Sequence, residues 1–281
     1  MIFRRILYYI IPCLLFILFC TACCSSPFQL KTAEMTLPGW DPAHRDVTFL
    51  VISDLHLRPE ILDRRFYRVL ERRVKELDPD IVFLLGDLLD FNSKGKIAPV
   101  KEKMLSILSN LRGRYGSYAV IGNHEVYCGE GMSVELFQEA GYTVLQDELQ
   151  TVEINGRPLS FIGVQEGYRQ NKYLPARLKE LLKKNPVPLI LCHRPDLFDG
   201  FPLETPFIFL SGHTHGGLFS FPFLRSGVFH FKGRPVYRKY PYGIFRSGKG
   251  KLLVTSGLGD SNYYSRFNIP YEVVLLKIRP E

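Results

Sequence analysis

The chain has 281 residues, 46% of them hydrophobic, so it can form one domain with a full core but not two large domains. Its formal net charge is +8 at pH 7, which favours phosphate esters, nucleic acid or an anionic membrane surface as partners without choosing among them. Four of the six cysteines lie within the first 24 residues. The two that remain exclude a disulfide framework in the domain.

The first thirty residues form a separate hydrophobic segment. Arg4 and Arg5 precede an uncharged stretch that runs from residue 6 to residue 22. This pattern predicts a single membrane contact through residues 6–23, either as an anchor in the cell (inner) membrane or as a signal peptide. Thr21-Ala22 before Cys23 also fits a lipoprotein cleavage site, so cleavage and lipidation stay open. Residues 31–46, which are rich in turn-forming residues, are expected to be a linker.

The remainder, residues 47–281, alternates strands and helices. Apolar runs predict strands over residues 47–52, 80–85, 116–121, 187–192 and 207–210. Helices are expected over residues 59–77, 98–111, 133–140 and 174–184, with a hairpin over residues 150–164. A final meander is expected to contain strands 252–256 and 273–278. This order predicts an α/β fold in which two mixed sheets are flanked by helices.

Five of the predicted strands end in side chains that can bind a metal ion. These are Asp54 with His56, Asp87, Asn123 with His124, His193, and His213 with His215. Each motif alone also fits a loop cap, a helix N-cap or a core histidine. However, the junctions contain five of the seven histidines in the chain. Cys192 is expected in the core, because its side chain in a strand points away from that of His193.

The ordered motifs resemble those of a known family. Asp-x-His, Gly-Asp-x-x-Asp, Gly-Asn-His-Glu, a single His and Gly-His-x-His are similar to the motifs of calcineurin-like metallophosphoesterases. The likeness covers about residues 47–279, and implies a four-layer α/β/β/α sandwich with hydrolase activity. Gly257-Leu258-Gly259 and the later segment 266–272 resemble the membrane-anchored, YaeI-like branch of this family.

The resemblance also implies a role for each motif residue. One metal would be bound by Asp54, His56, Asp87 and His215. Asp87 would bridge to a second metal, which is completed by Asn123, His193 and His213. His124 would be the general acid or transition-state donor, and Asp90 would orient its imidazole. No substrate-binding residue is assigned.

Such a ligand set suits phosphoryl chemistry on physical grounds. Two divalent ions about 3.5–4 Å apart can activate water and clamp the phosphoryl oxygens during an in-line displacement. Only two of the ligands are carboxylates, so two divalent ions leave a net charge of about +2, which attracts a phosphate. Oxygen and imidazole ligands suit manganese, iron or zinc, and the sequence does not decide among them.

Departures from the family pattern bear on the substrate. Glu125 gives the Gly-Asn-His-Glu form of the Ser/Thr protein phosphatases, but Phe91 and Ile121 occupy positions where those enzymes have arginine. Without these arginines a monoester dianion is poorly neutralised, so diesters or pyrophosphates are favoured. Leu218 replaces a glutamine that is common in the anchored branch.

The loop over residues 218–245 interleaves aromatic and basic side chains. It fits a membrane-facing or acyl-binding flap, a nucleic-acid surface, or a loop packed on its own aromatic rings. We therefore expect a membrane-associated, dinuclear metal hydrolase that cleaves a phosphodiester or pyrophosphate bond. UDP-2,3-diacylglucosamine, of lipid A biosynthesis, is the first candidate substrate. The alternatives are a nuclease of the same family and a non-catalytic module that binds phosphate ligands.

Overall fold

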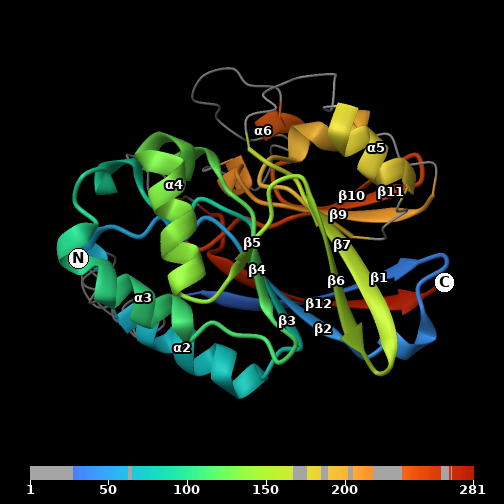
Figure 1. Ribbon diagram of the computed structural model, residues 1–281, viewed down its shortest axis with the longest axis horizontal. Coiled ribbons are helices and arrows are strands. Elements are labelled where there is room, and N and C mark those ends of the chain that lie inside the picture. Colours follow the sequence, from blue (N-terminus) through green and yellow to red (C-terminus); the bar gives the residue numbers. More distant parts are fainter. Residues whose placement is uncertain are drawn as a thin grey trace, which may run out of the picture.

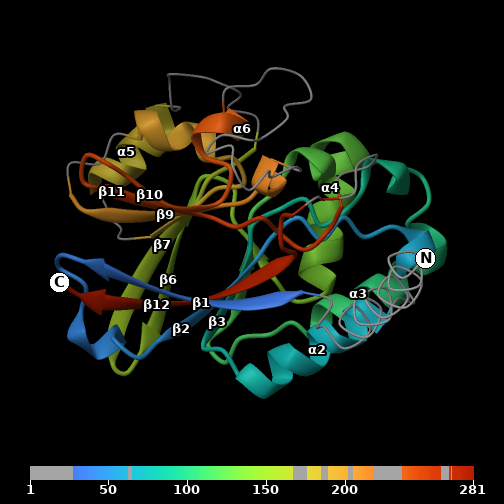
Figure 2. The ribbon, with the colours of Figure 1, turned by 180° about the vertical axis from the view of Figure 1, so that it is seen from behind.

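The computed structural model describes residues 28–62, 65–166, 176–184, 189–201, 205–217, 236–260, 266 and 268–281. Two six-stranded sheets pack face to face, and helices cover the outer face of each sheet (Figures 1 and 2). The predicted four-layer α/β/β/α sandwich is therefore confirmed.

The first sheet carries the N-terminal half of the chain and has the strand order β1-β12-β2-β3-β4-β5. Its strands are β1 (Gln29–Leu37), β12 (Glu272–Pro280), β2 (Thr48–Ile52), β3 (Ile81–Leu84), β4 (Ser117–Ala119) and β5 (Thr143–Val144). Strands β2 to β5 run parallel, with β12 antiparallel to β2. The crossovers contain α2 (Arg65–Leu77), α3 (Lys101–Ser109) and α4 (Asn123–Glu139), which cover the outer face (Figure 1).

The second sheet has the order β10-β11-β9-β8-β7-β6. It contains β6 (Glu148–Ile154), β7 (Arg157–Gly163), β8 (Leu189–Leu191), β9 (Phe207–Ser211), β10 (Gly243–Ser247) and β11 (Gly250–Val254). The four central strands are parallel, and the two edge strands are antiparallel to their neighbours. Helices α5 (Ala176–Lys184) and α6 (Val236–Lys239) lie over its outer face (Figure 1).

The main core lies between the two sheets. Phe49 and Phe83 stack with ring centroids 5.6 Å apart, and Phe83 meets Phe161 of the opposite sheet edge-to-face at 5.1 Å. A second core joins the first sheet to α2, α3 and α4 through residues such as Leu70, Leu108 and Phe137. Burial on both faces explains why the central strands are continuous apolar runs, and it holds their carboxyl ends in fixed positions.

Three expectations from the sequence need correction. Residues 31–46 are no linker: most of them belong to β1 and to the short helix η1 (Pro42–His44), and β1 pairs with β12 along nine residues. The helix expected over residues 133–140 lies in the second half of α4, which begins at Asn123 and is kinked at Gly129. The expected meander does not form, because β12 leaves the second sheet and inserts between β1 and β2 of the first.

Most of the predicted N-terminal anchor lies outside the described residues, as do residues 218–235 of the aromatic and basic loop. Within the part of the chain that the structure describes, no helix is long and apolar enough to cross a membrane.

Candidate metal centre

The predicted ligands all lie in loops that follow the carboxyl ends of strands in the two sheets. The loops after β2, β3 and β4 carry the first group, and those after β8 and β9 carry the second. Five of the nine described non-glycine residues with positive φ belong to this set: Asp54, His56, Asp87, His213 and His215. Such backbone is costly and persists only where the surroundings impose it, which is typical of functional sites.

One cluster of ligands consists of Asp54, His56 and His215, all buried. The Nε2 atoms of the two histidines are 3.0 Å apart. Asp54 Oδ1 lies 3.4 Å from Nε2 of His215 and 3.9 Å from Nε2 of His56. Burial lowers the pKa of both histidines and raises the pKa of Asp54 to about 6. Two neutral imidazole nitrogens and one carboxylate oxygen, close together, are suitable ligands for a divalent cation.

A second cluster consists of Asp87, His193 and His213. Nε2 of His193 lies 3.2 Å from Asp87 Oδ2 and 3.1 Å from His213 Nδ1. His193 Nδ1 donates to the carbonyl of Leu85 at 2.7 Å, which fixes the proton there and turns Nε2 toward the other ligands. Burial lowers the pKa of His193, but Asp87 outweighs it and raises the pKa to about 10. Asp87, His193 and His213 thus present three ligand atoms close enough together to hold one cation.

Asp87 links the two clusters. A third group joins it to His56 and His124, whose Nε2 is 3.7 Å from Asp87 Oδ2. Burial opposes the charge of Asp87, yet the surrounding histidines hold the pKa of this carboxyl well below its usual range. Asp87 therefore belongs to two of the three clusters, and its role as a bridging ligand stays a prediction.

The residues present fit a pair of divalent metal ions. Asn123 Oδ1 is buried and accepts no hydrogen bond within the described residues, which is expected of an amide oxygen that serves as a ligand. The donors are imidazole nitrogens and oxygens without thiolate, a set that does not identify the metal. When bound, such ions polarise a phosphoryl group and acidify water.

The surroundings of His124 differ from what the sequence implied for Asp90. Asp90 accepts from the backbone N–H of Asn92 at 2.8 Å and lies 3.6 Å from Arg58, while His124 Nδ1 is buried without a hydrogen-bond partner among the described residues. The role of Asp90 in orienting His124 stays a prediction. Instead, Phe91 stacks on the imidazole with ring centroids 3.4 Å apart and an interplanar angle of 16°.

Glu125 connects the two loops that carry Asp87 and Asn123. Its carboxylate is fully buried and accepts the backbone N–H groups of Asp87, Leu89 and Gly122 at 2.8, 2.9 and 2.9 Å. The Gly-Asn-His-Glu motif therefore supplies a cap for α4 and an anchor for the bridging loop.

Sequence reasoning missed the role of two arginines near the centre. Arg58 follows His56 by two residues and points toward Asp90. Arg266 donates to the carbonyls of Gly257 and Pro270, and its Nη2 lies 3.1 Å from Nδ1 of His215. Both place a positive charge near the metal clusters, at positions other than those of Phe91 and Ile121. In the sequence, the position of Arg58 two residues after His56 was the signal that could have placed this arginine near the metal centre.

Two mixed sheets, with buried and overlapping histidine and aspartate clusters at their strand ends, define the class of dimetal phosphoesterases. Residues 47–217 match the calcineurin-like phosphoesterase family, and the chain belongs to that family.

Curated relatives agree with this assignment. The chain is 31% identical to an uncharacterized metallophosphoesterase of Aquifex aeolicus, over 85% of this chain and 87% of the relative. It is 27% identical to one of Campylobacter jejuni over 89% of this chain, but it spans only 63% of that relative. It is also 27% identical to the phosphodiesterase YaeI of Escherichia coli, over 72% of each chain.

The structure brings the predicted metal ligands and His124 together at one edge of the sandwich. Six ligands fall in the three clusters, and Asn123 begins α4 beside His124. Cys192 is buried among apolar side chains of the second sheet.

Proposed function

We propose that the protein is a membrane-associated hydrolase that cleaves a phosphodiester or pyrophosphate bond and belongs to the YaeI-like branch of its family. The three overlapping clusters around Asp87 carry this proposal, because they supply two adjacent cation sites with one shared carboxylate. The formal net charge of +8 further favours an anionic substrate.

The ligand loops and His124 have separate roles in this proposal. The ligand loops would hold two cations in adjacent clusters, and these charges would attract and orient the phosphoryl group. His124 lies beside Asp87 and is the candidate donor to the leaving oxygen. Burial lowers the pKa of His124, and the opposing effect of Asp87 is smaller.

Two observations favour diesters or pyrophosphates over monoesters. Phe91 and Ile121 occupy the positions where the Ser/Thr phosphatases have arginines, so the charge available to neutralise a dianion is reduced. The relative from Escherichia coli is itself called a phosphodiesterase. Lipid-linked substrates are proposed because of the hydrophobic segment over residues 6–23, and UDP-2,3-diacylglucosamine is the substrate to test first.

The test uses the full chain in detergent, stripped of metal and reloaded with manganese, iron or zinc. It is assayed on a chromogenic phosphodiester, a monoester and UDP-2,3-diacylglucosamine, with Asp87→Ala and His124→Ala as controls. We expect turnover of the lipid nucleotide above that of the chromogenic diester, lost in both variants. Diester turnover without lipid turnover would keep the hydrolase and remove the lipid substrate.

A nuclease of the same family is the second candidate, favoured by the net charge. It predicts turnover of DNA or RNA with an affinity that falls steeply with salt. A module that binds phosphate ligands without catalysis predicts binding but no turnover of any substrate in the panel.

The side of the membrane needs its own experiment. A cytoplasmic lipid nucleotide requires a cytoplasmic active site, whereas Arg4 and Arg5 at the start of the segment favour the domain outside. Cys128 is unsuitable as a probe because it is buried. A cysteine introduced at exposed Ser106 on α3 reports the side through labelling by an impermeant maleimide in intact cells, relative to the parent chain.

A further inference from the structure

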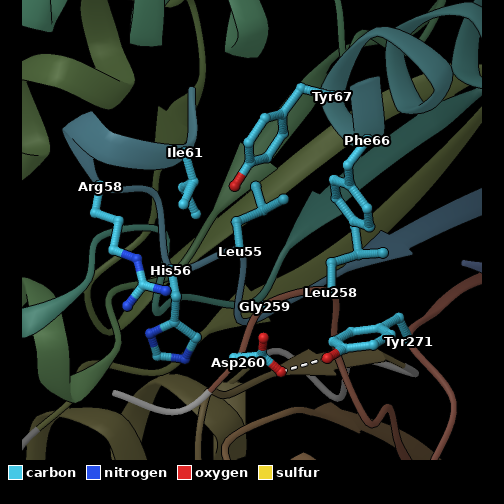
Figure 3. A pocket seen from close by; sticks show the side chains of 10 residues that line it. All are labelled: Leu55, His56, Arg58, Ile61, Phe66, Tyr67, Leu258, Gly259, Asp260 and Tyr271. Carbon is cyan, nitrogen blue, oxygen red and sulfur yellow. Dashed lines mark hydrogen bonds between the residues drawn. The ribbon is translucent and has the colours of Figure 1, made fainter. Parts of the chain in front are cut away.

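A cavity of about 270 Å³ opens beside the metal centre (Figure 3). His56 belongs both to the metal clusters and to the lining of this cavity. In Figure 3, His56 and Arg58 lie on one side, while Phe66 and Tyr271 lie on the other. The cavity therefore adjoins the metal clusters at His56.

The walls away from His56 and Arg58 are largely apolar. They are formed by Leu55, Ile61, Phe66, Leu258 and the rings of Tyr67 and Tyr271, with the Tyr67 hydroxyl and the Asp260 carboxylate as polar groups. Leu55, Ile61 and Leu258 are each less than a tenth exposed, so their positions are set by the core. A cavity with charge at one end and apolar walls at the other matches a ligand that has a phosphate head and an apolar substituent.

We propose that this cavity binds one alkyl or acyl chain carried by the phosphodiester substrate. The inference rests on the proposed function, because the chain is placed by the phosphate that it carries. The volume lies near the lower end of the range of about 300–1,000 Å³ for small-ligand sites, which suits one chain rather than a whole lipid.

The polar groups of the lining disfavour other occupants. The carboxylate of Asp260 accepts the hydroxyl of Tyr271 and would repel a second anionic group. A nucleobase carries several donors and acceptors, and each loses free energy if it is buried without a partner. A saturated chain has no polar group of its own that could be left unpaired, and burying its apolar surface away from water lowers the free energy.

Arg58 lies at the polar end of the same cavity. Its side chain is 23% exposed, and one terminal nitrogen lies 3.6 Å from Asp90. A guanidinium held there can hydrogen-bond to a non-bridging oxygen of the phosphate while the substituent enters the apolar part. The phosphate and the apolar substituent of the substrate would thus be joined near His56 and Arg58.

The test compares 4-nitrophenyl phosphodiesters whose second ester group is methyl, hexyl or phenyl, using the metal-loaded full chain. We expect kcat/KM for the hexyl ester to exceed that for the methyl ester at least tenfold. Ile61→Trp fills the cavity, so it should abolish this advantage by lowering kcat/KM more for the hexyl ester than for the methyl ester. Ile244→Trp, at an exposed position on β10, is the matched control and should change neither ester.

Phe66→Ala is a second variant, which removes one wall and should reduce the hexyl advantage severalfold. Equal rates for hexyl and methyl esters in the parent chain would overturn the pocket while leaving the phosphodiesterase intact. So would an equal loss for both esters in Ile61→Trp, or a preference for phenyl over hexyl.

Binding is measured separately, so the inference does not depend on turnover. Calorimetry with monohexyl and monomethyl phosphate should show tighter binding of the hexyl compound, and Ile61→Trp should remove the difference. If no ester is hydrolysed but this difference is present, the proposed function fails and the chain pocket stands. If binding of the two compounds is equal, the pocket is refuted.

Discussion

The Nε2 atoms of His56 and His215, which lie 159 residues apart in the sequence, face each other at 3.0 Å in the interior of the protein. Burial lowers the pKa of both rings, and Arg266 lowers it further, so both are neutral. At this distance either one Nε2 donates to the other or both lone pairs face a cation, and the carboxylate of Asp54 in the same cluster favours the cation. The pair is therefore arranged for a cation, and predictions about metal binding follow from it.

The first prediction concerns stability. Removal of metal by a chelator should lower the melting temperature, because a ligand at 100 times its Kd stabilises the folded state by about 2.7 kcal/mol. Asp87→Asn weakens both sites and should remove most of the difference between metal-loaded and stripped protein in a thermal melt. Asp46→Asn, at an exposed carboxylate, is the control and should retain it. Identical melting curves with and without metal would contradict the assignment.

A second prediction concerns Glu125. Glu125→Ala leaves three buried N–H groups without an acceptor, at about 1 kcal/mol or more each, so the free energy of unfolding should fall by about 3 kcal/mol. Glu125→Gln retains one oxygen acceptor and should lose less. Urea denaturation measures the effect, with Glu135→Ala on the exposed face of the same helix as the control. A loss below 1 kcal/mol for Glu125→Ala would show that the anchor contributes little.

A third prediction concerns Phe91. Because this ring stacks on His124, Phe91→Ala should lower kcat about tenfold, a part of the 10²–10⁴-fold effect of a general acid. Phe91→Tyr retains the stack and should remain near the parent rate. In a His124→Ala background the Phe91→Ala change should have no further effect on kcat. An additive loss in the double variant would mean that Phe91 acts by another route.

A fourth prediction concerns the thiol of Cys128. Burial, with a smaller effect of Glu125, raises the pKa of this thiol to about 11. The thiolate fraction at pH 8 is therefore small, and alkylation by iodoacetamide should be slow in the folded protein and fast in urea. Peptide mass spectrometry after timed labelling separates Cys128 from the other cysteines. Rapid labelling under native conditions would show that this part of α4 opens readily.

The sequence predicted the site better than the edges of the fold. Residues 47–52 and 207–210 were recognisable because strands buried on both faces are continuously apolar, and the ligands follow them directly. In contrast, β1 has buried residues only in its second half, and it pairs with β12, a partner 243 residues away at the Gln29 and Glu272 pair. Such long-range pairing leaves no local signal.

The start of α4 was missed for a different reason. Gly122, Gly129 and Gly131 interrupt the helical pattern, and Gly129 has φ of 127°. The helix starts at Asn123 because the side chain of Glu125 caps it at Gly122. The ligand motif itself therefore determines where the helix begins. The cavity beside His56 was likewise hidden, since its walls come from the segment after β2, from α2, from the segment after β11 and from Tyr271 just before β12.

The most direct test measures turnover of bis(4-nitrophenyl) phosphate by the full chain as a function of the metal bound per chain, determined by elemental analysis of the same samples. Two sites that share Asp87 predict that the rate rises with metal content and reaches its plateau at two ions per chain. A plateau at one ion, or a rate that does not depend on metal content, would contradict a dimetal phosphoesterase.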